Sequence, residues 1–336
     1  MSAAPHNSSS NTPRWQQELA EAVRDPAELL QLLDLDAGLL PAARKAAAQF
    51  PLRVPRGFVA RMQRGDPNDP LLRQVLPLAA ELEPAPGYLS DPVGDLQAMQ
   101  PGGILHKYHG RVLLVATGAC AIHCRYCFRR HFPYAEANAA ADHWTAALDY
   151  IRSRPEISEV ILSGGDPLVL NDRRLAELAR ALAEIPHLRR LRLHSRLPIV
   201  LPSRIDASLL DWFTGTRLTP VLVMHANHPR ELDAEVAAAT ARLRQHGVVL
   251  LNQTVLLAGV NDSAETLIEL SERLFTLGVQ PYYLHALDRV QGAGHFESDA
   301  VLRTLMPLLR ARLPGYLVPQ PVREEAGQPN KTPLPY

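Results

Sequence analysis

The sequence of 336 residues predicts an α/β fold in which a helical region precedes a parallel sheet with crossover helices. Two observations predict this class. From Trp15 to about Gln100, apolar residues recur every three or four positions and prolines stand near the segment starts. From residue 111 onwards, short β-branched and apolar runs alternate with helical segments. We expect a disordered tail at 1–13, a helical region at 14–100, a barrel domain at 101–313 and a C-terminal segment at 314–336.

The expected elements follow in chain order. The helical region contains WQQELAEAVRD, DPAELLQLLDLD, PAARKAAAQFP and DPLLRQVLPLAAEL. Six strands are expected at 111–117, 159–165, 188–195, 218–226, 248–257 and 279–287. Helices between them are expected in AADHWTAALDYIRS, NDRRLAELARALAEI, ELDAEVAAATARLRQHG and SAETLIELSERLFTLG. A closed or partial (β/α) barrel and an open doubly wound sheet both fit this order. Polar residues gather where the strands end, which favours a barrel with its site at the carboxyl ends of the strands.

Composition restricts the function. Basic and acidic residues number 35 each, so a basic surface for nucleic acid is not indicated. No apolar run approaches the roughly 20 residues that span a bilayer, and the N-terminus lacks the pattern of a secretory signal. We therefore expect a cytoplasmic protein that binds neither nucleic acid nor membrane, and a homo-oligomer stays open.

All three cysteines of the chain, Cys120, Cys124 and Cys127, lie within eight residues after the first expected strand. An odd, clustered set argues against a disulfide framework. A zinc site is one alternative, with His123 or His131 as a further ligand. Three thiolates can instead hold a [4Fe–4S] cluster whose fourth iron stays open to a bound molecule, whereas an electron-transfer cluster takes four.

The motif CxxxCxφC, with the aromatic Tyr126 before the third cysteine, resembles the radical S-adenosylmethionine (SAM) superfamily. In that superfamily the methionine amino and carboxyl groups of SAM chelate the open iron. The segment LSGGDPL at 162–168 follows the second expected strand and resembles the SAM-binding segment there. The resemblance assigns SAM contacts to Gly164, Gly165 and Asp166, and also to Tyr126.

The chain has only three lysines, Lys45, Lys107 and Lys331, against 32 arginines. Lys45, in an alanine-rich helix, is best read as a surface charge. Lys107 directly precedes the first expected strand, and Lys331 lies in the C-terminal segment. An amine attacks an aldehyde only when it is unprotonated, so a reactive lysine must leave bulk solvent.

Longer motifs narrow the resemblance. HKYHGRVLLVATGACAIHCRYCFRR, SGGDPL, HANHP, LLNQTVLLAGVND, PYYLHALD and GQPNKTP occur in the same order in the lysine 2,3-aminomutase family. The resemblance covers about residues 85–336. It implies a partial, six-repeat (β/α) barrel that uses a [4Fe–4S] cluster, SAM and pyridoxal 5′-phosphate (PLP).

The family's residues map onto the chain one by one. Lys331 matches the lysine that forms the internal aldimine with PLP, so we expect the C-terminal segment to fold back over the barrel mouth. Arg111 matches a ligand of the PLP phosphate, and Lys107 stands where relatives can have a phosphate-contacting arginine. Gln253 aligns with a polar contact to PLP, and His225 with a histidine on the SAM side.

The resemblance also identifies a substrate. Arg129 matches the arginine that binds the substrate α-carboxylate, a task that suits a guanidinium. Asp288 matches one of two acidic residues that hold the ε-ammonium of lysine. Glu324, seven residues before Lys331, stands at the second position, where catabolic relatives have aspartate. Two carboxylates facing an ammonium indicate L-lysine and argue against relatives specific for glutamate.

Catabolic members continue past the PLP lysine with further cysteines that bind zinc, whereas this chain ends five residues after Lys331. The chain therefore resembles the bacterial branch that supplies β-lysine to a ligase acting on translation elongation factor P. An electron donor such as a flavodoxin or ferredoxin is the further expected partner. The alternatives are a free-standing amino-acid aminomutase and a non-catalytic metal-binding module.

Overall fold

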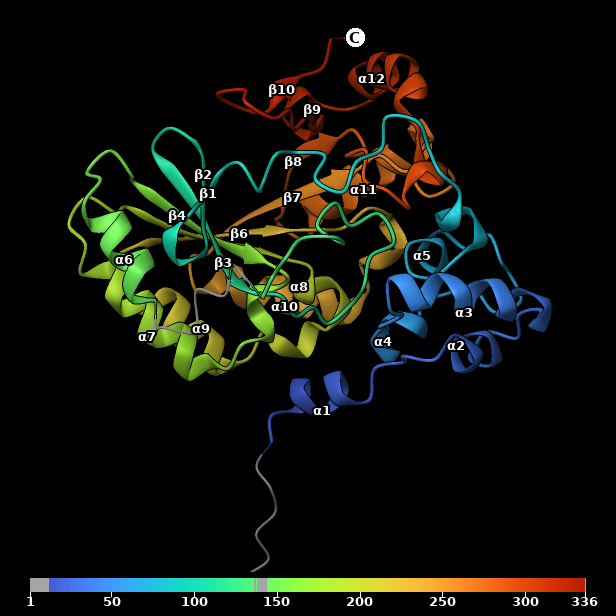
Figure 1. The fold of residues 1–336 in the computed structure, drawn as a ribbon, viewed down its shortest axis with the longest axis horizontal. Coiled ribbons are helices and arrows are strands. Elements are labelled where there is room, and N and C mark those ends of the chain that lie inside the picture. Colours follow the sequence, from blue (N-terminus) through green and yellow to red (C-terminus); the bar gives the residue numbers. More distant parts are fainter. Residues whose placement is uncertain (1–11, 136, 138–143, 336) are drawn as a thin grey trace, which may run out of the picture.

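The computed structural model describes residues 12–135, 137 and 144–335. Two of the expected segments lie partly outside the described residues. These parts are residues 1–11 of the expected tail and residues 140–143, the first four of the helix expected at 140–153. The remaining elements form one sheet with helices on its outer side and a helical region at one end (Figure 1).

The helical region begins with local signals that the sequence carries. Asp25 accepts a hydrogen bond from the Ala27 amide, and Pro26 takes the first helical position. Asp69 caps a second helix in the same way ahead of Pro70. The helices of this region are α1 (Arg14–Ala20), α2 (Pro26–Leu32), α3 (Leu40–Gln49), α4 (Arg56–Val59) and α5 (Pro70–Arg73).

All six expected strands are present, and each pairs in parallel with the next. They are β3 (Arg111–Thr117), β4 (Glu159–Gly164), β5 (Arg190–Ser195), β6 (Thr219–Met224), β7 (Val249–Val255) and β8 (Gln280–His285). The connecting helices are α6 (Thr145–Arg152), α7 (Asp172–Ala183), α8 (Leu197–Val200), α9 (Ala207–Thr214), α10 (Ala234–Gln245) and α11 (Ala264–Thr276). The order runs from β1 to β10 without closing, so the barrel is partial, as expected.

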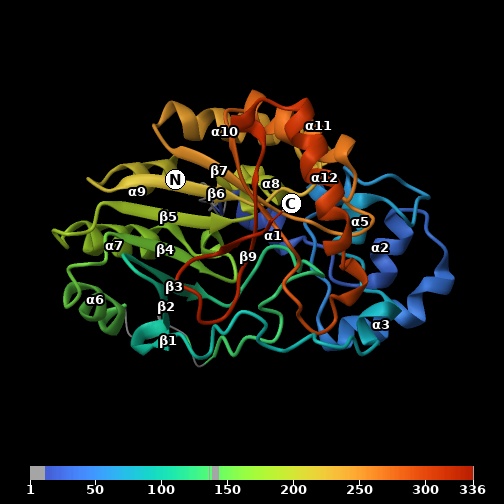
Figure 2. The ribbon, with the colours of Figure 1, turned by 90° about the horizontal axis from the view of Figure 1, so that it is seen from above.

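The sheet is longer at both ends than the sequence predicted. Before β3, strands β1 (Met99–Gln100) and β2 (Ile104–Tyr108) add an antiparallel edge. Lys107 therefore lies within a strand and not in a connection. After α12 (Asp299–Arg312), β9 (Gln320–Arg323) pairs in parallel with β8, and β10 (Thr332–Pro333) returns antiparallel to β9. Figure 2 shows β9 crossing in front of the curved sheet.

Burial along the strands separates two faces. In β5 the leucines at 191 and 193 are buried toward the helices, and Arg192 and His194, on the alternate face, are half-buried. Gln253 of β7 follows the same alternation. Polar side chains therefore line the inner face of the sheet, where a ligand would lie.

One hydrophobic cluster unites the helical region and the barrel. Trp15 and Phe58 belong to it together with Leu168 and Ile199, which follow β4 and β5. The helical region is thus packed on the barrel through buried apolar contacts. None of the helices in the described part of the chain combines the length and the apolar character that a membrane crossing requires.

Candidate active site

The three cysteines lie in the loop that follows β3, as predicted. The Cys127 amide donates to the Cys124 carbonyl at 3.0 Å, which turns the loop tightly. Burial and the neighbouring sulfurs raise the pKa of Cys120, and burial raises the pKa of Cys127 to about 11. Three thiols so close together ionise readily only when a cationic group compensates their charge. The donor set therefore fits a bound metal centre.

Among the described residues, no group of three or more His, Cys, Asp and Glu surrounds one point closely enough to hold a single metal ion. Zinc needs its ligands around one point, whereas an iron–sulfur cluster takes each thiolate on a different iron. His123 directs Nδ1 to the Pro51 carbonyl at 2.8 Å, and His131 directs Nε2 to the Gln291 carbonyl at 3.3 Å. Three thiolates in one loop are the ligand set that such a cluster requires when its fourth iron stays open.

Buried ion pairs anchor this loop to the helical region. Arg125 donates from Nε to Glu81 at 2.8 Å and from Nη2 at 2.5 Å. Arg130 donates from Nη2 to the same carboxylate at 2.9 Å. Removing one partner of such a buried set leaves an uncompensated charge, so the loop is held firmly.

A buried arginine contacts one of the sulfurs directly. Arg196, at the end of β5, donates from Nη1 to Cys124 Sγ at 2.8 Å. Its guanidinium also lies 5.6 Å from the centre of the Tyr126 ring. The Tyr126 hydroxyl accepts from Asn227 Nδ2 at 2.7 Å. Tyr126 is thus packed among protein groups beside the cysteines, and its contact with SAM stays a prediction.

The glycines after β4 are required by the protein backbone itself. The Gly165 amide donates to the Thr117 carbonyl at 2.7 Å, and the Asp166 amide donates to the Ala119 carbonyl at 2.8 Å. A Cβ on Gly165 would come 2.3 Å from the Ala119 oxygen, and Gly164 has a φ of 114°. The segment therefore fixes the start of the cysteine loop, whatever it contacts in a ligand.

The Asp166 carboxylate joins two strand ends. It accepts from the Ser195 hydroxyl at 2.8 Å and from the Arg196 amide at 2.8 Å. Burial raises its pKa to about 6, and these hydrogen bonds oppose the rise. The side chain thus positions Arg196, and its predicted contact with SAM stays a prediction.

Three histidines project polar atoms with no partner into the barrel. Nε2 of His194, His225 and His285 is buried and has no hydrogen-bond partner among the described residues. Burial lowers the pKa of all three, that of His225 to about 3, so they are neutral. The positive charge of Lys331 also lowers the pKa of each of these histidines. Buried groups without partners are costly, so this interior fits polar ligands such as SAM and PLP.

A chain of alternating charges connects the predicted substrate and cofactor residues. Arg129 donates from Nε to Asp95 Oδ2 at 2.7 Å, and Lys107 Nζ lies 2.5 Å from Asp95 Oδ1. Glu324 accepts from Lys107 at 2.8 Å and from Lys331 at 2.6 Å. The C-terminal segment therefore folds back onto the barrel, as the sequence predicted.

The two acidic residues predicted to bind an ammonium differ in their electrostatics. Burial alone would raise the pKa of Glu324, but Lys331 and Lys107 lower it below its usual range. Asp288 has no such partner, and its Oδ1 is buried without a hydrogen bond among the described residues. Burial and the charge of Glu324 raise the pKa of Asp288 to about 7. Asp288 is therefore a buried acidic residue that forms no ion pair within the described part of the chain.

The predicted phosphate ligands are not equivalent. Lys107 donates to the Val93 carbonyl at 2.9 Å and to Glu324 at 2.8 Å, and it also forms an ion pair with Asp95. Arg111 has no carboxylate partner among the described residues and lies 4.7 Å from the Tyr108 ring centre. Within the described chain, the Gln253 side chain forms no hydrogen bond. Arg111 and Gln253 are thus available to contact a ligand, whereas the Lys107 ammonium is bound by groups of the protein.

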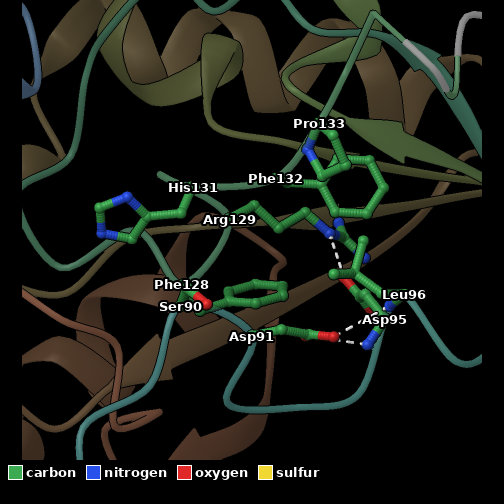
Figure 3. A pocket seen from close by; sticks show the side chains of 9 residues that line it. All are labelled: Ser90, Asp91, Asp95, Leu96, Phe128, Arg129, His131, Phe132 and Pro133. Atoms are coloured by element: carbon green, nitrogen blue, oxygen red, sulfur yellow. Dashed lines mark hydrogen bonds and ion pairs between the residues drawn. The ribbon is translucent and has the colours of Figure 1, made fainter.

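A cavity of about 30 Å³, room for roughly one water molecule, lies beside Arg129. The Arg129 side chain points toward Asp95 across it, between Phe128 and Phe132 (Figure 3). The Asp91 carboxylate accepts from the Asp95 amide at 2.9 Å and so fixes the loop.

Sequence reasoning missed Asp95, Arg196, His194 and His285. Asp95 becomes recognisable only through a partner 34 residues away, whereas Arg196, whose contact with Cys124 spans 72 residues, belongs to the HSR strand end. His194 and His285 stand at strand ends, in HSR and HALD, so the clustering of polar residues there was their available signal.

The partial barrel, with three cysteines after its first parallel strand, defines the class. The model of the Radical SAM superfamily matches residues 114–271, a span that includes the three cysteines. The chain is a radical SAM enzyme, with the [4Fe–4S] cluster and SAM that this class implies.

Relatives define the family. L-lysine 2,3-aminomutase of Escherichia coli (strain K12) is 52% identical over 329 residues, which cover 96% of each chain. The Haemophilus influenzae protein of that name is 47% identical over 95% of this chain and 94% of its own. The Clostridium subterminale protein is 33% identical over 95% of this chain and 77% of its own. The chain belongs to the lysine 2,3-aminomutase family and is an isomerase, which confirms the family predicted from its motifs.

Proposed function

We propose that this enzyme uses PLP together with SAM to convert L-α-lysine into β-lysine, and that the β-lysine serves the modification of translation elongation factor P. The observation that carries the lysine assignment is the charge chain from Arg129 through Asp95 and Lys107 to Glu324. The chain has the Arg129 guanidinium at one end and the Glu324 carboxylate at the other, which supports binding of a lysine molecule with an α-carboxylate and a distal ammonium.

The substrate residues have distinct tasks. Arg129 is buried: Asp95 holds its Nε, the Ser163 hydroxyl accepts from its Nη1 at 3.3 Å, and its Nη2 forms no hydrogen bond among the described residues. That free edge suits the α-carboxylate. Asp288, with its buried unpartnered oxygen, suits the ε-ammonium, and the binding of a cation there would offset the cost of its burial. Glu324 contributes a second carboxylate at the same end.

Other residues would hold the cofactors. Cys120, Cys124 and Cys127 would bind three irons of the cluster, and the histidines of the inner face would meet SAM and PLP. Lys331 would carry PLP, with Arg111 at the phosphate. When bound, the cluster and SAM supply a radical that removes hydrogen from carbon 3, and PLP delocalises the unpaired electron while nitrogen migrates. The surrounding buried side chains exclude water from this chemistry.

Lys331 would exchange partners during cofactor loading. Its Nζ is held 2.6 Å from Glu324 and is only 20% exposed on its side chain. Lys331 would hold PLP through this amine, while Lys107 would still neutralise Glu324. Glu324 would then be able to accept the ammonium of the substrate in place of the Lys331 ammonium.

The link to elongation factor P is supported by resemblance to the branch of the family that serves it. Identity is higher with the Escherichia coli relative, whose length the chain nearly matches, than with the longer Clostridium subterminale relative. A free-standing aminomutase is the alternative. When the product of the enzyme is incubated with elongation factor P and its lysyl ligase, the mass of the factor should increase by one lysyl group. A factor of unchanged mass would favour the alternative.

Substitution at Lys331 tests the cofactor assignment. Lys331→Ala should remove the visible absorbance of bound PLP, and Lys45→Ala, at an exposed lysine without an ion pair in the described chain, should retain it. Anaerobic reconstitution should give about four irons per chain in both variants. Incubation with SAM, a reductant and isotopically labelled L-lysine should yield β-lysine. Intact cofactors without β-lysine would redirect the assignment to another amino acid.

A further inference from the structure

Two arginines face each other beside the cysteine loop. Val23 and Val54 exchange backbone hydrogen bonds of 2.8 and 3.0 Å in an antiparallel bridge, and both are fully buried. Arg24 and Arg53 are the next pair along this bridge, so their side chains emerge on its other face. Arg24 is exposed and Arg53 is half-buried.

This pair is unfavourable for stability. Like charges directly opposite each other in an antiparallel pair destabilise it. Within the part of the chain that the structure describes, neither arginine forms an ion pair, and Arg53 Nε is buried without a hydrogen bond. Burial and the guanidinium of Arg24 lower the pKa of Arg53. The chain as a whole carries as many acidic as basic residues, so this local excess does not reflect a general surplus.

The pair lies next to the cysteines. The Arg53 carbonyl accepts from the His123 amide at 2.9 Å, and His123 stands between Cys120 and Cys124 in the chain. Gly118 and Ala119, which lead into Cys120, are exposed. The cysteine loop therefore contacts Arg53, and part of the loop is exposed.

We infer that Arg24 and Arg53 form the docking surface for an acidic one-electron carrier protein that reduces the cluster. The inference rests on the proposed function, because it requires a cluster on the three cysteines. Each encounter transfers one electron: the carrier is oxidised by one electron and the cluster is reduced by one, with no proton moved. Complementary charge accelerates such an encounter without requiring a large interface, as is usual for transient redox pairs.

Reduction kinetics of the reconstituted enzyme test this inference. Reduced flavodoxin serves as the protein carrier, dithionite serves as the small reductant, and the readout is the electron paramagnetic resonance signal of the reduced cluster. Arg24→Glu should slow reduction by flavodoxin about tenfold or more at low ionic strength, and the difference should shrink in high salt. Reduction by dithionite should not change.

The melting temperature of Arg24→Glu distinguishes a loss of docking from misfolding. A carboxylate opposite Arg53 forms a favourable cross-strand pair, so the melting temperature should stay equal or rise while reduction slows. Arg180→Glu, at an exposed arginine of α7, should leave both quantities unchanged. Equal rates with flavodoxin for the wild type and Arg24→Glu would overturn the docking surface. Failure of dithionite to produce the signal would instead overturn the cluster, and with it the proposed function.

Discussion

Asp288 gives the sharpest test of the electrostatics of this site. Its pKa rises from 3.8 to about 7 because the side chain is buried and faces Glu324. A shift of that size corresponds to about 4 kcal/mol, and partial solvent screening reduces the expected effect to about 2–4 kcal/mol. Asp288→Asn removes the titration and keeps the shape of the side chain.

The sign of the pH dependence follows from proton binding. Between about pH 4 and pH 7 the folded protein retains a proton on Asp288 that the unfolded chain has lost. The contribution of this residue to stability therefore decreases as pH rises through that window, and its full cost is present above pH 7. The free energy of unfolding of Asp288→Asn minus that of the wild type should increase by about 1–3 kcal/mol from pH 5 to pH 8, because about one unit of the shift lies below pH 5.

Guanidinium chloride unfolding of both proteins without PLP, at several pH values, measures this difference. Other titrating groups are common to the two proteins and largely cancel. A difference that stays constant with pH, or that decreases toward pH 8, would refute the reasoning. Activity adds an independent result, because the variant lacks the carboxylate for the ε-ammonium and should lose turnover of L-lysine at every pH.

Two further predictions concern the framework of the site. Gly165→Ala should destabilise the protein by about 3 kcal/mol and lower its iron content, because the new Cβ would meet the Ala119 oxygen at 2.3 Å. The matched control is Gly57→Ala, where a new Cβ would meet nothing within 4 Å. This control should be neutral or slightly stabilising in thermal unfolding. Asp95→Asn should lower the free energy of unfolding by about 3 kcal/mol in chemical denaturation and raise KM for L-lysine. The reason is that Arg129 loses the carboxylate that fixes its Nε at 2.7 Å. Unchanged KM with unchanged stability would contradict that positioning role.

Local patterns in the sequence determined the main architecture. The six parallel strands and most of their helices repeat within short windows, where apolar spacing reports directly on burial. The cysteine spacing likewise predicted the class of enzyme, because three ligands in one loop need no knowledge of the rest of the fold. β9 was missed since its four residues, Gln320–Arg323, include a proline and carry too short a pattern to stand out.

The arrangement of charges was decided by the tertiary structure alone. Sequence motifs identified Arg129, Glu324 and Lys331 as separate functional residues. They did not show that Asp95 and Lys107 connect these residues. Two of those contacts, Arg129–Asp95 and Lys107–Glu324, join side chains that are 34 and 217 positions apart, and their strength depends on burial that no local pattern encodes. The sequence therefore established which chemistry this protein can hold, and the fold established which groups compensate one another, since electrostatic energies depend on distance and solvent exclusion in three dimensions.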